Sequence, residues 1–335
     1  MGELIDWNNI VSLGAGAPLS DFGDPQREFA AARTRAVVTP VRRFDLLRIH
    51  KGEAKAFLQG QLTCDLEQVT AEQAQFGGYC TPKGRLLANF ILMSASQGYL
   101  MYLPADLANA TADRLRKFIL RSQVKIEREY GLGILGLGGP GALDLLQREV
   151  AEVPVARLAM ACNDGERVVR LPGEQFLIVA ASADMPTLWA KLTKHATPVG
   201  ANCWSWLQIQ ARVPWITAAT LDQFLPQMIG LDAVGGVSFD KGCYTGQEIV
   251  ARSRYLGEVK RSLRPGHTRV GVRPGEALSW NGKQCATVLN AASMPDGGSE
   301  FLAVVSEQVD GQATVQTSNG EAASLSALPG ASVPG

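Results

Sequence analysis

The sequence predicts an α+β protein that ends in an all-β domain. Its 335 residues exceed what one compact core usually holds, so two or three domains are expected. Strands, helices and hairpins are mixed between residues 44 and 195 without strict βαβ alternation, which favours α+β layers. Beyond about residue 265, closely spaced turn signals separate short apolar runs, a pattern typical of a small β-barrel.

The first predicted domain covers residues 36–130 and follows an N-terminal extension, residues 1–35, which is rich in Gly, Ala, Pro and Asp. Residues 200–262 are a candidate completion of this domain. Its expected elements are, in chain order, a strand at 44–49, a short helix at 53–59, a hairpin of 86–93 with 99–103, and a helix at 106–122. Leu115, Phe118 and Ile119 would share one face of that last helix.

A second domain of the same kind is predicted over residues 131–200. Its expected elements are a strand at 132–137, a helix at 142–150, a hairpin of 167–171 with 175–180, and a helix at 185–195. Asp184 precedes that last helix as a cap, and Pro186 lies in its first turn. No sequence repeat of fixed period relates the two domains, so any doubling is structural.

The C-terminal domain, residues 263–327, carries hairpin signals. Asn281 and Gly282 stand between Trp280 and Lys283, which predicts a type I′ turn. Further turns at 296–298 and 310–311 bound the apolar runs at 301–306 and 313–317. The last residues, 328–335, are Pro, Gly, Ser and Ala, and we expect a disordered tail.

The composition excludes several classes of protein. Lys plus Arg and Asp plus Glu are 32 each, which argues against a surface that coats nucleic acid or an anionic membrane. There is no apolar run of about 20 residues and no secretory signal, so we expect no membrane association. The six cysteines lack CxxC spacing, which disfavours a local zinc or cluster site and suits a reducing cytoplasm.

Residues 136–141 read Gly-Leu-Gly-Gly-Pro-Gly, between a predicted strand and a predicted helix. This pattern fits the glycine fingerprint of dinucleotide-binding folds. However, Pro140 lacks an amide that could hold phosphate, and no acidic residue ends a second parallel strand at the expected distance. We therefore favour a tight strand-to-helix turn.

The segment that carries chemistry is the octet at residues 241–248, Lys-Gly-Cys-Tyr-Thr-Gly-Gln-Glu. Thr245 and Glu248 have the spacing of a capping box, which predicts a helix from Gly246. Cys243 would lie just before that helix, beside the positive end of the helix dipole, and two residues from the positive charge of Lys241. Both positive charges favour the thiolate form of Cys243. Gly242 and Gly246 have no side chain, so backbone or a ligand could approach them closely. The alternative is a buried cysteine in a tight turn.

Residues 224–248, which end in this octet, resemble the signature of YgfZ-type folate-binding proteins, relatives of the glycine-cleavage aminomethyltransferase. Residues 57–65 and the turn at 82–85 match the family as well. The matching segments follow one another in the same order as in the family over about residues 40–265. The resemblance implies a ring of two ferredoxin-like α+β domains and a C-terminal antiparallel β-barrel. It also implies tetrahydrofolate, or a derivative, in a central channel.

The same resemblance implies a cytoplasmic accessory factor, without an assigned catalytic activity, that supports iron–sulfur enzymes. Some of these thiomethylate tRNA. The expected partners are iron–sulfur proteins and their assembly factors, with tRNA involved indirectly, and we expect a monomer. Cys243 is the candidate functional thiol.

The resemblance assigns candidate folate contacts position by position. Phe44 and Trp204 match the aromatic residues that flank the folate, with Trp206 as a neighbouring candidate, although core packing would equally explain Phe44. Gln210 stands where the family usually has an acidic residue, and Arg212 where it has a glycine. Two further candidate contacts come from the octet, Tyr244 and Gln247.

Between residues 241 and 264, six basic side chains stand against two acidic ones. Such a stretch could receive an anion, such as a folate glutamate tail or RNA phosphates, or form a solvated helix face. The candidate residues of this anion-binding motif are Lys241, Gly242, Gly246, Glu248, Arg252 and Arg254.

Two other functions compete with the accessory factor. A folate-dependent aminomethyl or one-carbon transferase would need carboxylates for proton transfer, and the matching positions are Trp204, Ser205 and residues 208–210, which carry none. A protein that binds tRNA directly is disfavoured by the neutral charge and the lack of an RNA-binding module. The basic side chains at 252–264 favour it.

Overall fold

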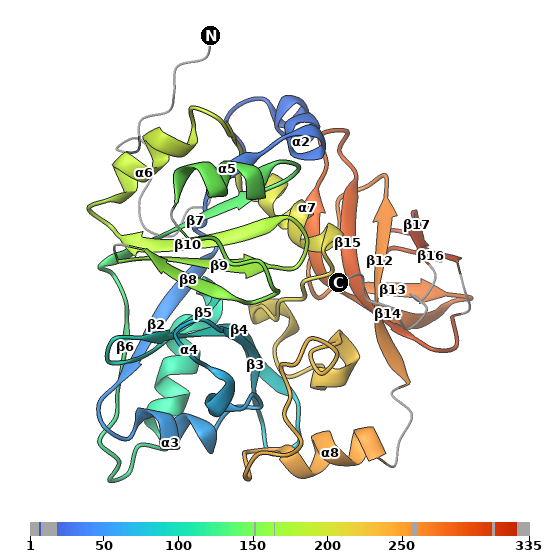
Figure 1. Ribbon diagram of the computed structural model, residues 1–335. Helices are drawn as coiled ribbons and strands as arrows, with labels where there is room; N and C mark the ends of the chain where they lie inside the picture. Colours follow the sequence, from blue (N-terminus) through green and yellow to red (C-terminus); the bar gives the residue numbers. More distant parts are fainter. Residues whose placement is uncertain are drawn as a thin grey trace.

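The computed structural model describes Trp7 and residues 19–150, 152–163, 165–255, 260–309 and 312–326. Two β-sheets with flanking helices and a closed β-barrel make up this part of the chain (Figure 1). The α+β prediction with a C-terminal barrel is therefore confirmed. Among the described residues, no helix has both the length and the apolar character that a bilayer crossing requires.

The first sheet is antiparallel, with strand order β3-β4-β5-β2-β6. Its elements are β2 (Phe44–His50), α3 (Ala54–Gln59), β3 (Gln75–Cys80), β4 (Leu86–Ala95), β5 (Gly98–Pro104), α4 (Ala105–Arg116) and β6 (Lys125–Arg128). The predicted hairpin is confirmed, with Ala95 opposite Gly98. Helix α4 ends earlier than predicted, because Arg116 donates to the carbonyl of Ile126 and the chain turns toward β6. Phe118 is consequently 49% exposed rather than buried.

The second sheet has the strand order β11-β1-β7-β10-β9-β8. Its elements are β1 (Val37–Pro40), β7 (Leu132–Gly138), α5 (Ala142–Glu149), β8 (Met160–Asn163), β9 (Glu166–Leu171), β10 (Gln175–Ala181), α6 (Met185–Leu192) and β11 (Thr197–Pro198). Strand β1 precedes the first sheet in the sequence, yet it pairs with β7 and β11 here. The chain therefore crosses between the two sheets directly before β2.

The glycine motif forms the tight turn between β7 and α5, as predicted. Its glycines have a packing role. A Cβ atom at Gly136 would lie 2.8 Å from the indole of Trp204, and one at Gly138 would lie 3.3 Å from it. The absence of these two side chains lets Trp204 lie flat against the strand.

Helix α2 (Pro25–Thr34) corrects the expectation that residues 1–35 lack regular structure. Asp24 caps it by accepting from the amide of Arg27 at 3.0 Å, and Pro25 occupies its first turn. The buried carboxylate of Glu28 accepts from the amides of Phe22 at 2.5 Å and Gly200 at 2.8 Å. These bonds hold α2 against the start of helix α7 (Ala201–Gln210).

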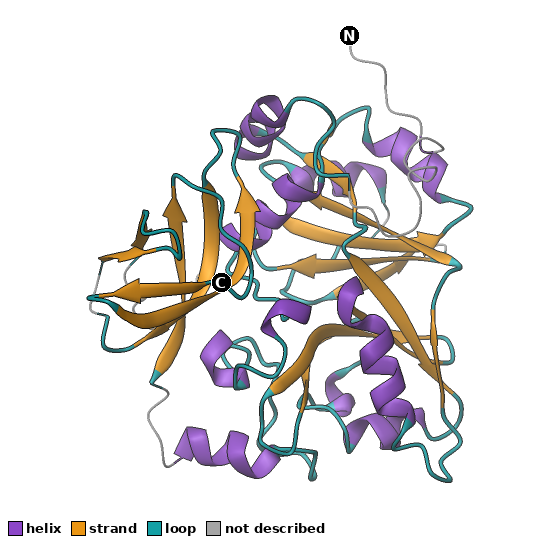
Figure 2. Cartoon of the chain, turned by 180° about the vertical axis from the view of Figure 1, so that it is seen from behind, coloured by secondary structure: helices purple, strands orange, loops and turns teal. Residues whose placement is uncertain are grey.

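The C-terminal barrel closes in the order β12-β15-β14-β13-β16-β17. Its strands are β12 (Arg261–Thr268), β13 (Ala277–Trp280), β14 (Lys283–Ser293), β15 (Ser299–Ser306), β16 (Ala313–Gln316) and β17 (Ala322–Leu325). Asn281 and Gly282 have φ values of 51° and 74°, which confirms the type I′ turn. The predicted tail at 328–335 lies outside the described residues. Helix α7 contacts β1, β14 and β15, and so it joins the second sheet to the barrel (Figure 2).

Candidate functional site

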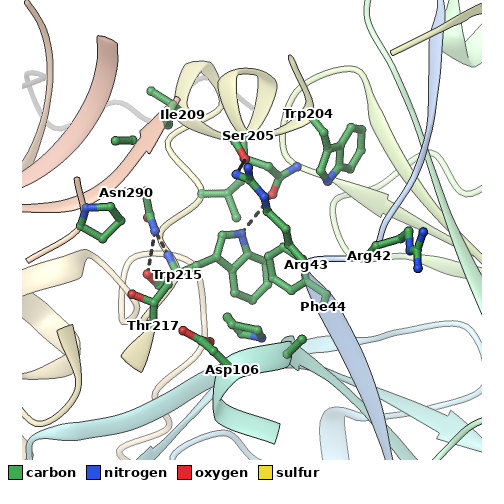
Figure 3. A pocket seen from close by; sticks show the side chains of 16 residues that line it. Arg42, Arg43, Phe44, Asp106, Trp204, Ser205, Ile209, Trp215, Thr217 and Asn290 are labelled. Carbon is green, nitrogen blue, oxygen red and sulfur yellow. Dashed lines mark hydrogen bonds between the residues drawn. The ribbon is translucent and has the colours of Figure 1, made fainter. Parts of the chain in front are cut away.

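A cavity of about 320 Å³ lies between the first sheet, helix α7 and the barrel (Figure 3). Phe44 at the start of β2 and Asp106 at the start of α4 line one side. Trp204 of α7, Trp215 from the segment after it and Asn290 of β14 line the others. The volume is at the lower end of the range of small-molecule sites, about 300–1,000 Å³.

Aromatic rings form much of the cavity wall. Phe44 stacks on Tyr102 with 4.6 Å between ring centroids and meets Trp215 edge-on at 4.8 Å. Trp204, placed by the glycines of β7, lines the cavity from α7. Phe44 and Trp204, which the resemblance assigns to the two sides of the folate, both line this one cavity. Rings in this arrangement suit a flat, π-rich ligand.

Trp215 is fixed by asparagines from two different parts of the chain. Asn89 of β4 donates to the carbonyl of Pro214 at 2.8 Å and accepts from the amide of Ile216 at 2.7 Å. Asn290 accepts from the amide of Trp215 at 2.9 Å and donates to its carbonyl at 2.8 Å. Both asparagines satisfy the backbone as a neighbouring strand would. The strand-like segment around Trp215 is thereby held between the first sheet and the barrel.

Polar groups complete the cavity. Gln208 accepts from the indole nitrogen of Trp215 at 3.2 Å. Asp106 accepts from the backbone amide of Ala218 at 2.8 Å. Arg43 reaches α7, where it donates to Ser205 and Asn202. The site therefore offers amide, carboxylate and guanidinium groups beside its aromatic walls.

Gln210 does not line this cavity. Its side chain donates to Glu300 of β15, in a separate polar hollow of about 280 Å³. Residues two apart on a helix point about 200° apart, so Gln208 faces the aromatic cavity and Gln210 does not. Trp206 lies against Phe29, with 5.7 Å between ring centroids, so Trp204 is the tryptophan of α7 that lines the cavity.

Cys243 is exposed, which rules out the buried-cysteine alternative. It lies in an irregular segment four residues before the first residue of helix α8 (Gln247–Tyr255). By contrast, burial raises the pKa of the Cys64 and Cys80 thiols to about 12. Cys243 is therefore chemically accessible where those thiols are not.

The start of α8 differs from the predicted capping box. The helix begins at Gln247 rather than Gly246. Within the described residues, it is the Gln247 side chain, not that of Glu248, that reaches back, accepting from the amide of Tyr244 at 3.3 Å. Gly246 has a φ of 85°, and a Cβ atom there would collide with the carbonyl oxygen of Thr81. This glycine therefore lets the octet pack against the turn that precedes β4.

Lys241 is directed inward. Its ammonium donates to the carbonyls of Leu62 at 2.7 Å and Cys64 at 2.8 Å. Burial lowers its pKa to about 8. The ammonium also lies 5.3 Å from the ring centroid of Tyr244, which is buried and whose hydroxyl has a pKa raised by burial. Neither Tyr244 nor Gln247 lines the cavity, so the structure separates them from Phe44 and Trp204.

The basic stretch at 241–264 is not one continuous surface. Arg264 is 1% exposed, and its guanidinium donates to the carbonyls of Ser326 and Val309. Together with Lys241, it satisfies internal backbone groups. Of the candidate anion-binding residues, Gly242, Glu248, Arg252 and Arg254 are exposed, as are the basic residues Lys260 and Arg261. Arg254 also stacks over the ring of Phe239 at 4.1 Å.

Sequence reasoning missed Trp215, Arg43 and Asn290, which line the cavity. Trp215 follows Pro214 directly, and a tryptophan in a loop after a helix is a signal that could have found it. Asn290 stands at an irregularity of the β14 register, which is visible only once the strands are paired.

Comparison with known proteins finds several relatives with one name, although no family model matches the sequence. The chain is 34% identical to the tRNA-modifying protein YgfZ of Colwellia psychrerythraea over 223 residues, which cover 66% of this chain and 68% of that one. For the protein of the same name from Yersinia pestis, identity is 31% over 281 residues, 82% and 85% of the two chains. For that of Serratia proteamaculans it is 29% over 314 residues, 91% and 95%.

Among solved structures, the glycine cleavage system aminomethyltransferase T from Bartonella henselae has the same fold. The TM-score is 0.75 at 19% sequence identity, and the match covers 90% of this chain and 88% of that one. The expected aminomethyltransferase-like architecture is thereby confirmed.

Proposed function

Because this chain belongs to the family of YgfZ proteins, we propose that it is a folate-binding accessory factor for iron–sulfur enzymes, including those that thiomethylate tRNA. The observation that carries the folate part of the proposal is the aromatic-walled cavity between the first sheet, α7 and the barrel. The name of the relatives supports the link to tRNA modification.

The residues of the cavity fit a reduced folate. Phe44, Trp204 and Trp215 offer faces and edges to the pterin ring, each good aromatic contact worth about 1 kcal/mol beyond burial. Gln208 and Asp106 offer amide and carboxylate groups to the ring edge. Tetrahydrofolate, when bound, supplies a reduced pterin that carries one-carbon units. The chain's own residues hold that ring and shield it from water.

Cys243 provides the second half of the proposed function. Its thiol is exposed, and none of the described residues that line the cavity belongs to the octet. The thiol therefore meets its partner from outside. A thiolate is a soft ligand and nucleophile, which suits contact with an iron–sulfur protein or an assembly factor.

A folate-dependent one-carbon transferase is the second candidate, and Asp106 is the observation that favours it. It is the one carboxylate among the described residues that line the cavity. However, the amide of Ala218 already occupies one of its oxygens, and a transferase must both accept and return protons. The accessory role therefore remains our proposal.

Fluorescence titration with tetrahydrofolate tests the cavity directly, because two of the tryptophans line it. We expect saturable quenching of the tryptophan emission. Phe44→Leu should weaken binding about fivefold, the equivalent of about 1 kcal/mol for one aromatic contact. Phe118→Leu, the same change at an exposed site away from the cavity, should leave binding unchanged. Absence of a saturable signal, or equal effects of both variants, would refute the assignment.

A further inference from the structure

Arg43 is a charged side chain in the cavity wall with neutral partners. Its Nη1 donates to the hydroxyl of Ser205 at 3.2 Å, and its Nη2 donates to the side-chain carbonyl of Asn202 at 3.1 Å. No described carboxylate forms an ion pair with it, and burial alone lowers the pKa of the guanidinium. A half-buried arginine without a carboxylate partner is costly, since the desolvation of its charge is not offset within the chain.

The other charged groups of the cavity leave this charge uncompensated. Asp106 is the one carboxylate of the described lining, and its side chain already accepts from the amide of Ala218. The positive charge of Arg43 is therefore not paired with the carboxylate of the described lining. An anionic group on the ligand would complement it.

The side chain is also held in place for recognition. Ser205 and Asn202 lie one turn apart on α7, and together they engage two of the five N–H donors of the guanidinium. The remaining donors stay available on a group whose rotamer is already fixed. A guanidinium prepared in this way suits the planar, two-oxygen geometry of a carboxylate.

We propose that Arg43 binds a carboxylate of the ligand, so that the cavity selects folates, which carry a glutamate, over pterins that lack one. This inference rests on the proposed folate function and adds to it the group that is recognised. A folate glutamate tail was one of the possible ligands of the basic stretch at residues 241–264, but none of the described residues in that stretch lines the cavity.

The test compares two ligands that share a reduced pterin ring. Tetrahydrofolate carries the glutamate, and 6-methyltetrahydropterin carries no carboxylate. Their dissociation constants are measured by calorimetry on the full chain for the wild type, Arg43→Gln and Arg43→Lys. Arg121→Gln serves as the matched control, because it removes the same charge from an exposed site away from the cavity.

We expect Arg43→Gln to weaken tetrahydrofolate binding about 10- to 100-fold, as for the loss of a charged hydrogen bond. Binding of 6-methyltetrahydropterin should change by less than about twofold, which also shows that the cavity remains folded. Arg43→Lys keeps the positive charge but lacks the planar set of N–H donors of a guanidinium. It should therefore weaken tetrahydrofolate binding less than Arg43→Gln does.

Equal weakening of both ligands by Arg43→Gln would overturn the inference, because Arg43 would then only support α7. Unchanged tetrahydrofolate binding would overturn it while leaving the folate function standing. A wild-type chain that binds neither ligand would overturn both.

Discussion

The ammonium of Lys241 donates to the backbone carbonyl of Cys64 at 2.8 Å. This bond joins two segments that lie far apart in the sequence, the octet and residues 57–65. Thr63 adds a second connection, since its hydroxyl donates to the carbonyl of Gly236 at 2.6 Å. Residues 57–65 and 224–248, two of the stretches that resemble the family signature, are therefore joined into one structural unit, which holds the loop that presents Cys243.

This arrangement predicts a pH dependence of stability. The pKa of Lys241 is about 8 in the folded chain, below its ordinary value of 10.5, because burial disfavours the charged form. The unfolded chain therefore binds more protons between these two pH values, and stability should rise with pH there. We expect the unfolding free energy of the wild type to increase, relative to that of Lys241→Met, from about pH 8 to pH 10.5.

Urea denaturation of both proteins across this pH range measures the difference. Groups that both proteins share, such as Cys64, largely cancel in the comparison. A difference that stays constant or falls with rising pH would contradict the inward, desolvated placement of Lys241.

The two asparagines that hold Trp215 should contribute unequally. Asn89 is fully buried, so Asn89→Ala leaves the carbonyl of Pro214 and the amide of Ile216 without partners, at about 1–3 kcal/mol for each group. Asn290 lines the cavity, so water can replace its amide, and Asn290→Ala should cost about 1 kcal/mol. Chemical denaturation of the two variants checks this order, and a larger loss for Asn290→Ala would reverse our assignment.

Arg212 occupies a backbone conformation that favours glycine. Its φ is 55°, directly after α7, where the amide of Val213 returns to the carbonyl of Gln208 at 2.9 Å. A left-handed residue with a side chain costs about 1–2 kcal/mol relative to glycine. Arg212→Gly should therefore raise the unfolding free energy by about 1 kcal/mol.

The neighbouring change Ala211→Gly is the control, because Ala211 has a φ of −79° and gains nothing from glycine. Thermal unfolding of both variants decides the matter. If Arg212→Gly destabilised the chain as much as Ala211→Gly, the side chain of Arg212 would matter more than its backbone.

Local signals in the sequence were sufficient for many elements. The hairpins at Ala95 and Gly98 and at Asn281 and Gly282 follow from turn residues whose conformation is set within a few positions. Helix α2 was missed although Asp24 and Pro25 form a valid helix start, because the surrounding Gly and Ala composition hid its short apolar face.

The cavity depended on contacts that no local pattern contains. Trp215 lines the cavity only because Asn89 and Asn290, which are distant from it in the sequence, hold the backbone of its segment. Gln210 was preferred over Gln208 because the resemblance fixed the position, while the direction of each side chain depends on the rotation of α7 against the barrel. The glycines of residues 136–141 gained an explanation only when Trp204 was found against them.

The central claim is that the exposed thiol of Cys243 performs the function while the cavity binds folate. The most direct measurement is the level of thiomethylated tRNA nucleosides in a bacterial strain that lacks its own YgfZ and expresses this chain. Cys162→Ser, which alters the other exposed cysteine, should restore the modification as well as the wild type. We predict that Cys243→Ser folds and binds tetrahydrofolate normally but restores no more than the empty vector. Restoration to the wild-type level by Cys243→Ser would contradict the account.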